Sequence, residues 1–402
     1  MQRFSPHITA LLDRYTDKIY PSKEKLIQAL QSRKLTIYHG VDPTAPQLHL
    51  GHATNYLLLR GLQDLGHKII LLIGDFTAQI GDPTGKSQTR KPLTPQEVLK
   101  NSKTYKSQVG KILNFSTKRN PVLLKYNSAW LSKLTFVDVV QVAAKTTVSR
   151  LIQRDMFQER MKEGREIYLH EFLYPVMQGY DSVAMNVDAE VGGTDQMFNM
   201  LVGRDFMRAL RRKEKFVITT PLFVNPKTGK KLMSKSEGEY VGLSDPPNQM
   251  YGKIMALPDE VVFPCLRLCT EVSLHEIAKM EKNIQSNKLS WRDAKAFLAK
   301  ENVRIYHGVK EAEAAEEEFV RVFREKKQPK EMAVVSGLHS SLALGDALVR
   351  AGLIPSKAQA RRVVEQGGVK VDGKVYQDPR MSFGWKPGMV IQIGKRRFAK
   401  LI

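Results

Sequence analysis

The sequence predicts an α/β protein: a parallel-sheet domain, then a helical region, then a small α+β module. Three observations lead to this prediction. Residues 34–76 show a strand–helix–strand pattern, residues after about 221 show turns and then charged amphipathic helices, and the last sixty residues form a separate basic segment. At 402 residues the chain is long enough for two or three domains.

The first strand and helix are indicated by residues 34–76. Residues 34–41 (KLTIYHGV) have the composition of a strand, and the turn at residues 42–45 ends it. A helical pattern follows, with leucines on one face and Gly66 at its C-terminal end. Residues 68–76 (KIILLIGDF) are almost continuously apolar, which suits a strand buried on both faces of a parallel sheet. Together they predict the βαβ unit of a nucleotide-binding α/β fold.

Later elements are predicted from local signals. Residues 94–97 (TPQE) have the pattern of a capping box with proline at the first helical position, so a helix should begin there. Residues 121–126 are expected to form a further strand, and residues 130–165 have a helical pattern. Gly192 and Gly193 should break the chain before another helix.

Changes in composition suggest where the domains begin and end. We expect a first domain over residues 1–225 and a helical domain over residues 226–325. A linker should cover residues 326–340, and a separate basic module should cover residues 341–402.

The charge balance points to a polyanionic partner. Lys and Arg number 63 against 41 Asp and Glu, a net charge of +22, and nucleic acid is the commonest partner for such a surplus. A generally basic proteome is the alternative explanation. No apolar stretch approaches the ~20 residues of a membrane helix, and the first residues lack the pattern of a signal peptide, so we expect a cytoplasmic protein. Cys265 and Cys269 should be packed thiols on one helix face, and no metal site is expected.

The first motif with chemical meaning is residues 49–52 (HLGH), which follow the first predicted strand and open a helix. Helix N-termini present unpaired N–H groups and hold anions. Gly51 would let a nucleotide approach the backbone, while His49 and His52 could donate hydrogen bonds to phosphate oxygens in a transition state. Taken alone, histidines near a helix start are more often surface or capping residues, and their placement after the first strand makes the two interpretations about equal.

The second motif, residues 230–238 (KKLMSKSEG), combines lysines with small residues after a turn. Such a loop could fold over a triphosphate and neutralise the departing pyrophosphate, or it could be a solvated basic loop. The pair of motifs, about 180 residues apart, resembles the two signatures of class I aminoacyl-tRNA synthetases. By this resemblance His49, His52 and Lys235 would be catalytic. The first lysine of the second signature is replaced here by Leu232, and only Lys235 maps cleanly onto it.

Four further blocks make the chain resemble the tyrosyl-tRNA synthetases. They are residues 38–49 (YHGVDPTAPQLH), 81–86 (GDPTGK), 171–181 (EFLYPVMQGYD) and 192–196 (GGTDQ). The resemblance covers nearly the whole chain. It implies a Rossmann-like catalytic domain, an α-helical anticodon-side domain and a C-terminal RNA-binding domain.

The same resemblance implies a tyrosine site. Tyr38 and Asp181 would supply the buried donor and acceptor that a phenol group needs, and a substrate without the hydroxyl would leave both unsatisfied. Asp82, Tyr174 and Gln178 would hold the substrate ammonium. The full tyrosine-binding set that we expect is Tyr38, Asp42, Asp82, Tyr174, Gln178, Asp181 and Gln196. Since Tyr174, Gln178 and Asp181 are spaced to share one helix face, they could instead simply cap the core.

The resemblance also implies an ATP site, with Asp195 near the ribose. The set that we expect is His49, Gly51, His52, Asn55, Gly193, Asp195, Met233, Ser234 and Lys235. Mg²⁺ would come with ATP rather than occupy a fixed protein site. The tyrosine carboxylate would attack the α-phosphate, and a ribose hydroxyl of the terminal adenosine of tRNA(Tyr) would then take the tyrosyl group. A homodimer is also implied, with residues near 130–165 at its interface.

The C-terminal module has its own resemblance. Residues 341–402 carry twelve Lys and Arg against four Asp and Glu. A helix is predicted over residues 342–351, a second helix after Ser356, and a hairpin with an Asp-Gly turn in residues 367–374. The pattern resembles the S-four RNA-binding domain. Its tRNA-binding residues would be Arg361, Arg362 and Lys370, unless the basic surface is merely solvated.

Three rival functions remain open at this point. The sister synthetase for tryptophan shares the core, but Tyr38 and Asp181 suit a phenol better. A small-molecule nucleotidyltransferase could use residues 49–52, but it would leave the basic module without a purpose. A non-catalytic RNA-binding protein derived from a synthetase should have lost His49, His52 or Lys235, and all three are present.

Overall fold

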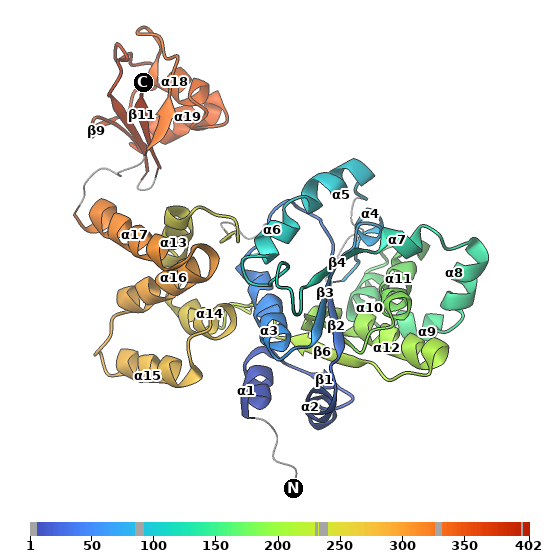
Figure 1. Ribbon diagram of the computed structural model, residues 1–402. Helices are drawn as coiled ribbons and strands as arrows, with labels where there is room; N and C mark the ends of the chain where they lie inside the picture. Colours follow the sequence, from blue (N-terminus) through green and yellow to red (C-terminus); the bar gives the residue numbers. More distant parts are fainter. Residues whose placement is uncertain (1–5, 85–91, 230–231, 233–239, 326–331, 395–396) are drawn as a thin grey trace. The chain divides into compact units, whose positions relative to one another are not determined.

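The computed structural model describes all residues except 1–5, 85–91, 230–231, 233–239, 326–331 and 395–396. The chain divides into two compact units, Met1–Glu316 and Glu317–Ile402 (Figure 1). Each unit has its own sheet, so each is described separately below.

The first unit is built on a six-stranded sheet with the strand order β1-β6-β5-β2-β3-β4. Every neighbouring pair is parallel except β1 and β6. The strands are β1 Ile19–Tyr20, β2 Thr36–Val41, β3 Lys68–Ile73, β4 Leu123–Tyr126, β5 Ala189–Gly193 and β6 Phe216–Thr220. The strands predicted around residues 34–41, 68–76 and 121–126 are therefore confirmed as β2, β3 and β4.

The strand order creates a crevice at the carboxyl ends of β2 and β5. From β2 the chain adds β3 and then β4 on one side, whereas β5 and β6 lie on the other side. Ligands of open α/β sheets bind where the order reverses in this way. Gly192 and Gly193, which we expected to break the chain before a helix, are the last residues of strand β5, and the expected helix follows them from Met197.

Local sequence signals account for several helix ends in the first unit. Gly66, at φ +87°, ends α3, and Thr94 forms the predicted capping box with Glu97. Residues 128–162 form four short helices. The helices here are α1 Pro6–Tyr15, α2 Lys23–Ser32, α3 Ala53–Asp64, α4 Thr77–Ile80, α5 Pro95–Ser102, α6 Tyr105–Val109, α7 Ser128–Leu131, α8 Phe136–Ala143, α9 Val148–Leu151, α10 Asp155–Lys162, α11 Leu169–Met185 and α12 Met197–Arg211.

Helix α11 is held firmly at its first turn and along one side. Its capping box joins Tyr168 and Glu171, and the buried Glu171 carboxylate also accepts from Arg160 Nη1 at 2.6 Å. Gly179 lets α11 approach α12 closely, since a Cβ there would lie 3.0 Å from the Phe206 ring. The helix can therefore present fixed side chains to the crevice.

The remaining helices of the chain before its second sheet form a helical region. They are α13 Pro247–Met255, α14 Val262–Cys269, α15 Leu274–Gln285, α16 Trp291–His307 and α17 Val309–Phe319. Cys265 and Cys269 are both buried free thiols on α14, as predicted.

The second unit contains a five-stranded sheet with the order β7-β11-β10-β8-β9 and two helices, α18 Leu344–Arg350 and α19 Lys357–Glu365. Its strands are β7 Ala333–Val335, β8 Val369–Val371, β9 Lys374–Tyr376, β10 Val390–Ile393 and β11 Arg397–Leu401. Ser356 caps α19 and the Asp372-Gly373 turn joins β8 to β9, both as predicted. The expectation of a linker over residues 326–340 needs correction, because β7 lies within it and pairs with β11.

Candidate active site

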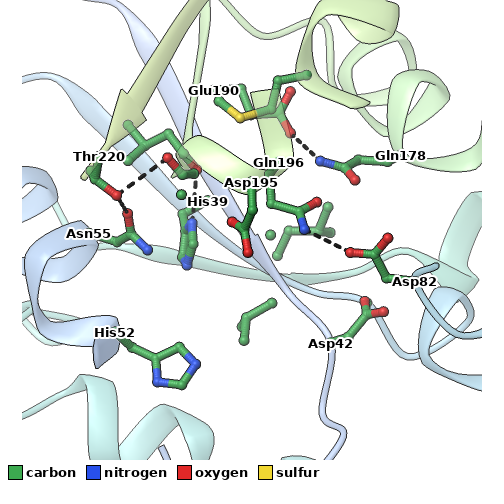
Figure 2. Close-up of a pocket in the computed structure, with 18 of the residues that line it drawn as sticks. His39, Asp42, His52, Asn55, Asp82, Gln178, Glu190, Asp195, Gln196 and Thr220 are labelled. Atoms are coloured by element: carbon green, nitrogen blue, oxygen red, sulfur yellow. Dashed lines mark hydrogen bonds between the residues drawn. The ribbon is translucent and has the colours of Figure 1, made fainter. Parts of the chain in front are cut away.

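A cavity of about 330 Å³ lies at the crevice between β2 and β5. Its walls come from the ends of β2, β3, β5 and β6, the first turn before α3, and one face of α11. Figure 2 shows side chains from these elements around one hollow, although they are up to 181 positions apart in the chain, from His39 to Thr220. We call the part lined by Tyr38 and Asp181 the deep end, and the part lined by His49 and His52 the histidine end.

The deep end is a closed hydrogen-bonded wall. Tyr38 is fully buried on β2, and its hydroxyl lies 2.9 Å from Ser182 Oγ. Asp181 accepts from Trp130 Nε1 at 2.7 Å and from Asn127 Nδ2 at 3.2 Å. Burial raises the pKa of Asp181 well above its usual range, and these two hydrogen bonds oppose that rise. The wall therefore offers a phenolic hydroxyl and a carboxyl group at fixed positions.

Beside the deep end, Asp42 is held by two hydroxyl groups. Tyr174 Oη donates to one of its oxygens at 2.8 Å, and Thr77 Oγ1 donates to the other at 2.8 Å. Gly74 makes this possible, because a Cβ at that position would lie 1.9 Å from Asp42 Oδ1.

Two further polar pairs cross the cavity wall. Gln196 Nε2 donates to Asp82 Oδ2 at 2.7 Å, and Gln178 Nε2 donates to Glu190 Oε1 at 3.0 Å (Figure 2). The other oxygen of Asp82 accepts from the backbone and hydroxyl of Thr84 at 2.9 and 2.6 Å. Acidic and amide groups thus surround a position where a ligand ammonium would be favoured.

The histidine end is formed by the short helical turn Leu50–His52, which leads directly into α3. His49 caps this turn, with its Nδ1 accepting from Gly51 N at 3.2 Å. The rings of His49 and His52 lie 4.1 Å apart, centre to centre. Two imidazoles and backbone N–H groups at a helix start form a suitable environment for phosphate.

Asn55 lies one turn along α3 from these histidines. Its Oδ1 accepts from Thr220 Oγ1 at 2.7 Å, which ties α3 to the end of β6 (Figure 2). Gly193 and Asp195 line the cavity nearby.

His39 is a cavity residue to which we assigned no role from the sequence. It is buried on β2; its Nδ1 lies 2.8 Å from Val191 O, whereas its Nε2 has no hydrogen-bond partner among the described atoms. Burial lowers the pKa of His39, which favours the neutral ring. His39 could have been predicted as a cavity residue, because it is next to Tyr38 in the family block of residues 38–49.

The structure brings together every described residue of the two predicted ligand sites. Those lining the cavity are Tyr38, Asp42, His49, Gly51, His52, Asn55, Asp82, Tyr174, Gln178, Asp181, Gly193, Asp195 and Gln196. The predicted residues Met233, Ser234 and Lys235 lie outside the described residues, as do Lys230 and Lys231. Leu232, the departure from the signature, lines the cavity.

Two negative findings hold for the described part of the chain. No cluster of three or more His, Cys, Asp or Glu side chains there could hold a metal ion. No helix in the same residues has the length and apolar character needed to cross a membrane.

Comparison with known proteins identifies the family. The model for class I tRNA synthetases of the tryptophan and tyrosine group matches residues 30–324. The tyrosine–tRNA ligase of Moorella thermoacetica is 44% identical to this chain, over 97% of this chain and 94% of that protein. The chain belongs to the tyrosine–tRNA ligase family. The ligase of Thermotoga maritima is also 44% identical, over 94% of each chain.

Solved structures agree with the fold of this family. A C-terminally truncated mitochondrial tyrosyl-tRNA synthetase from Coccidioides posadasii superposes with a TM-score of 0.63 at 25% identity, over 77% of this chain and 91% of that chain. The predicted class I α/β fold is thereby confirmed. Of the three rivals, the tryptophan synthetase shares the family model, but these relatives are named for tyrosine.

The second unit also has a match. The S4 domain model covers residues 344–391, which confirms the resemblance seen in the sequence. Arg361 and Arg362 are exposed on α19, where Arg361 pairs with Glu365 at 2.7 Å, whereas Lys370 is half-buried on β8.

Proposed function

We propose that the cavity is where this chain carries out the reaction of its family, the ATP-dependent attachment of L-tyrosine to tRNA(Tyr). Tyrosine and ATP form tyrosyl-adenylate with release of pyrophosphate, and the tyrosyl group then passes to the tRNA with release of AMP. The observation that carries the proposal is the division of one cavity into a buried wall with a hydroxyl and a carboxyl group and a half-buried helix start with two histidines.

In this proposal the substrate side chain occupies the deep end. Its phenol hydroxyl accepts from Tyr38 and donates to the Asp181 carboxyl group. Asp82, Tyr174 and Gln178 hold the ammonium, with Asp42 and Gln196 fixing Tyr174 and Asp82 by the hydrogen bonds described above. The substrate carboxylate then points toward the histidine end.

ATP occupies the histidine end, with its phosphates against Gly51 and the first turn of α3. The tyrosine carboxylate attacks the α-phosphate in line with the departing pyrophosphate. His49 and His52 stabilise the negative charge that develops there, and we assign the same role to Lys235 of the second signature.

The rest of the nucleotide extends over β5, where Gly193 and Asp195 meet the ribose. Asn55 supports this wall through Thr220, and Met233 and Ser234 complete the site from the second signature. Mg²⁺ bound to the triphosphate, rather than at a fixed protein site, would supply further positive charge there.

The experiment that tests this proposal is ATP–pyrophosphate exchange without tRNA, run with each of the twenty amino acids in turn. The proposal predicts exchange with tyrosine alone. Exchange with tryptophan would move the assignment to the sister enzyme. No exchange with any amino acid would indicate an RNA-binding protein that has lost catalysis.

We propose further that residues 341–402 bind tRNA(Tyr) through Arg361, Arg362 and Lys370. Phosphate contacts of this kind release counterions, so removing them should reduce the salt dependence of tRNA binding. Replacing Arg361 and Arg362 with glutamine should weaken tRNA binding while exchange with tyrosine stays unchanged. Equal salt slopes for the variant and the original chain would contradict this role.

The proposed active form is a cytoplasmic homodimer, with residues near 130–165 at the interface. Helices α8 and α9 expose large apolar side chains, among them Phe136 at 83% and Val148 at 68%. Such a surface usually marks a protein contact. Replacing Phe136 with aspartate should lower the mass measured by light scattering to that of one chain.

A further inference from the structure

Behind the deep end lies a lysine that does not line the cavity. Lys215 directly precedes β6, and its side chain is 0% exposed. Its ammonium donates to Ser182 Oγ at 2.9 Å and forms an ion pair with Glu190, which is also buried. Lysine is almost never fully buried without a partner, and here both partners lead to cavity residues.

One branch leads through Ser182 to Tyr38. An ammonium group can only donate, so Ser182 Oγ must accept from Lys215. The hydrogen of Ser182 is then available to the Tyr38 oxygen, 2.9 Å away. With its oxygen bound in this way, Tyr38 keeps its own hydrogen, for which the adjacent Glu190 carboxylate and a ligand in the cavity compete.

The other branch leads through Glu190 to Gln178. Lys215 binds one carboxylate oxygen of Glu190 and Gln178 Nε2 donates to the other at 3.0 Å. Both oxygens are therefore engaged, which weakens the Glu190 carboxylate as an acceptor for the nearby Tyr38 hydroxyl. Burial, together with the nearby Glu190 and Asp181 carboxyl groups, raises the pKa of Tyr38 well above its usual value, so the hydroxyl stays protonated.

The surrounding backbone leaves room for this ammonium. Gly203 on α12 faces it, and a Cβ at that position would lie 2.7 Å from Lys215 Nζ and 3.0 Å from Ser182 Oγ. The ammonium also lies 5.8 Å from the centre of the Tyr38 ring. The Lys215 ammonium is thus held close to Tyr38, the residue that we propose binds the phenol of the substrate.

We propose that Lys215 is a positioning residue for tyrosine recognition, which sets the donor direction of Tyr38 through Ser182 and the position of Gln178 through Glu190. This inference rests on the proposed tyrosine site. It adds a residue outside the cavity that controls the choice between tyrosine and phenylalanine.

The test compares Lys215→Met with the double variant Glu190→Gln/Lys215→Met in ATP–pyrophosphate exchange. The single variant leaves the buried Glu190 carboxylate without a cationic partner, so it can lose stability. The double variant removes both charges and keeps an acceptor for Gln178, so it should fold. Thermal unfolding measured on both variants separates the loss of folded protein from a change in recognition.

For the double variant we expect KM for tyrosine to rise about ten-fold and the tyrosine-to-phenylalanine ratio of kcat/KM to fall about ten-fold, because one buried hydrogen bond is lost. KM for ATP, and kcat at saturating tyrosine, should stay within about two-fold. Lys213→Met is the matched control. Lys213 lies two residues before Lys215 in the chain and forms an ion pair with Asp188 at 3.0 Å. Arg33 still pairs with Asp188 in that control.

The outcomes separate the inference from the proposed function. If the double variant folds and keeps the original KM for tyrosine and the original discrimination, Lys215 is purely structural and the inference is overturned. Equal changes in KM for tyrosine and KM for ATP would overturn it as well. If the unaltered chain shows no exchange with tyrosine, the proposed function itself has failed.

Discussion

The two ends of the cavity are built differently. At the deep end, Tyr38 and Asp181 are 0% and 3% exposed, and their polar atoms are held by Ser182, Trp130 and Asn127. At the histidine end, His49 and His52 are only half-buried and form hydrogen bonds within their own turn. A preformed buried wall suits recognition of one side chain, whereas an open helix start suits a larger, charged ligand that arrives and leaves.

The difference teaches that selection and chemistry are separable in this site. Changes at the deep end should alter which amino acid is used, and changes at the histidine end should alter how fast any bound amino acid reacts. Of the four predictions below, three test this separation and one tests the stability of the strand that carries Tyr38; they run from the largest expected effect to the smallest.

Replacing His52 with alanine should lower kcat for exchange about 10²–10³-fold, because one donor to the developing negative charge is lost. KM for tyrosine should change little, since His52 lies at the other end of the cavity. Steady-state exchange kinetics with varied tyrosine measure both values. A large rise in KM for tyrosine with an unchanged kcat would contradict the separate roles of the two ends of the cavity.

Lowering the pH should reduce the free energy of unfolding, because it disrupts a contact next to β2, the strand that carries Tyr38. Leu35 N, just before β2, donates to Nδ1 of the buried His67 at 3.2 Å, and burial lowers the pKa of His67 from 6.5 to about 4. Between those values the unfolded chain binds a proton that the folded chain does not. Stability is therefore fully present above pH 6.5 and falls by roughly 3 kcal/mol as the pH drops to 4.

Urea unfolding of His67→Asn at several pH values checks this effect. Asparagine keeps an acceptor for Leu35 N but does not titrate, so the stability difference between pH 7 and pH 4 should shrink. His275→Asn, at an exposed position on α15, is the control and should keep the original pH dependence. The same slope in both variants would rule out His67 as the source.

Replacing Asp181 with asparagine should reduce the preference for tyrosine over phenylalanine about ten- to a hundred-fold, since one of the two buried oxygens that can accept from the phenol becomes an NH2 donor. Because Trp130 still donates at this position, the fold should persist. The measurement is kcat/KM for both amino acids in exchange. An unchanged ratio, with both values lowered together, would mean that Asp181 supports the site without reading the hydroxyl.

Adding one methyl group at Gly74 should disturb the deep end with a smaller effect. Gly74→Ala would push Asp42 away from Tyr174 and lower stability by about 1–3 kcal/mol through overpacking. KM for tyrosine should rise more than KM for ATP. Gly252→Ala, on α13 with open space at the Cβ position, should instead stabilise the chain by about 0.5–1 kcal/mol.

Local patterns predicted the elements whose signals lie within a few residues. The Thr94 capping box, Gly66 at the end of α3, and the Asp372-Gly373 turn are examples, because each depends on its own backbone geometry. Strands β6 and β7 were not predicted. The three residues of β7 become a strand only by pairing with β11, more than sixty residues later in the chain.

The site was predictable as a set of residues but not as a set of contacts. Family blocks supplied the residues that line the cavity. They did not reveal that Gln196 binds Asp82, 114 residues away, or that Tyr38 binds Ser182. Lys215 gave no signal, since a single lysine before a strand is usually solvated and its partners are fixed only by the sheet and α11.

The most direct test of this account is calorimetric titration of the ATP-free protein with L-tyrosine and with L-phenylalanine. A preformed deep end predicts that tyrosine binds without nucleotide and that phenylalanine binds at least ten-fold more weakly, because phenylalanine has no hydroxyl to accept from Tyr38 and donate to Asp181. Equal affinities, or tyrosine binding only after a non-hydrolysable ATP analogue is added, would contradict the account in which the deep end selects the amino acid and the histidine end carries out the chemistry.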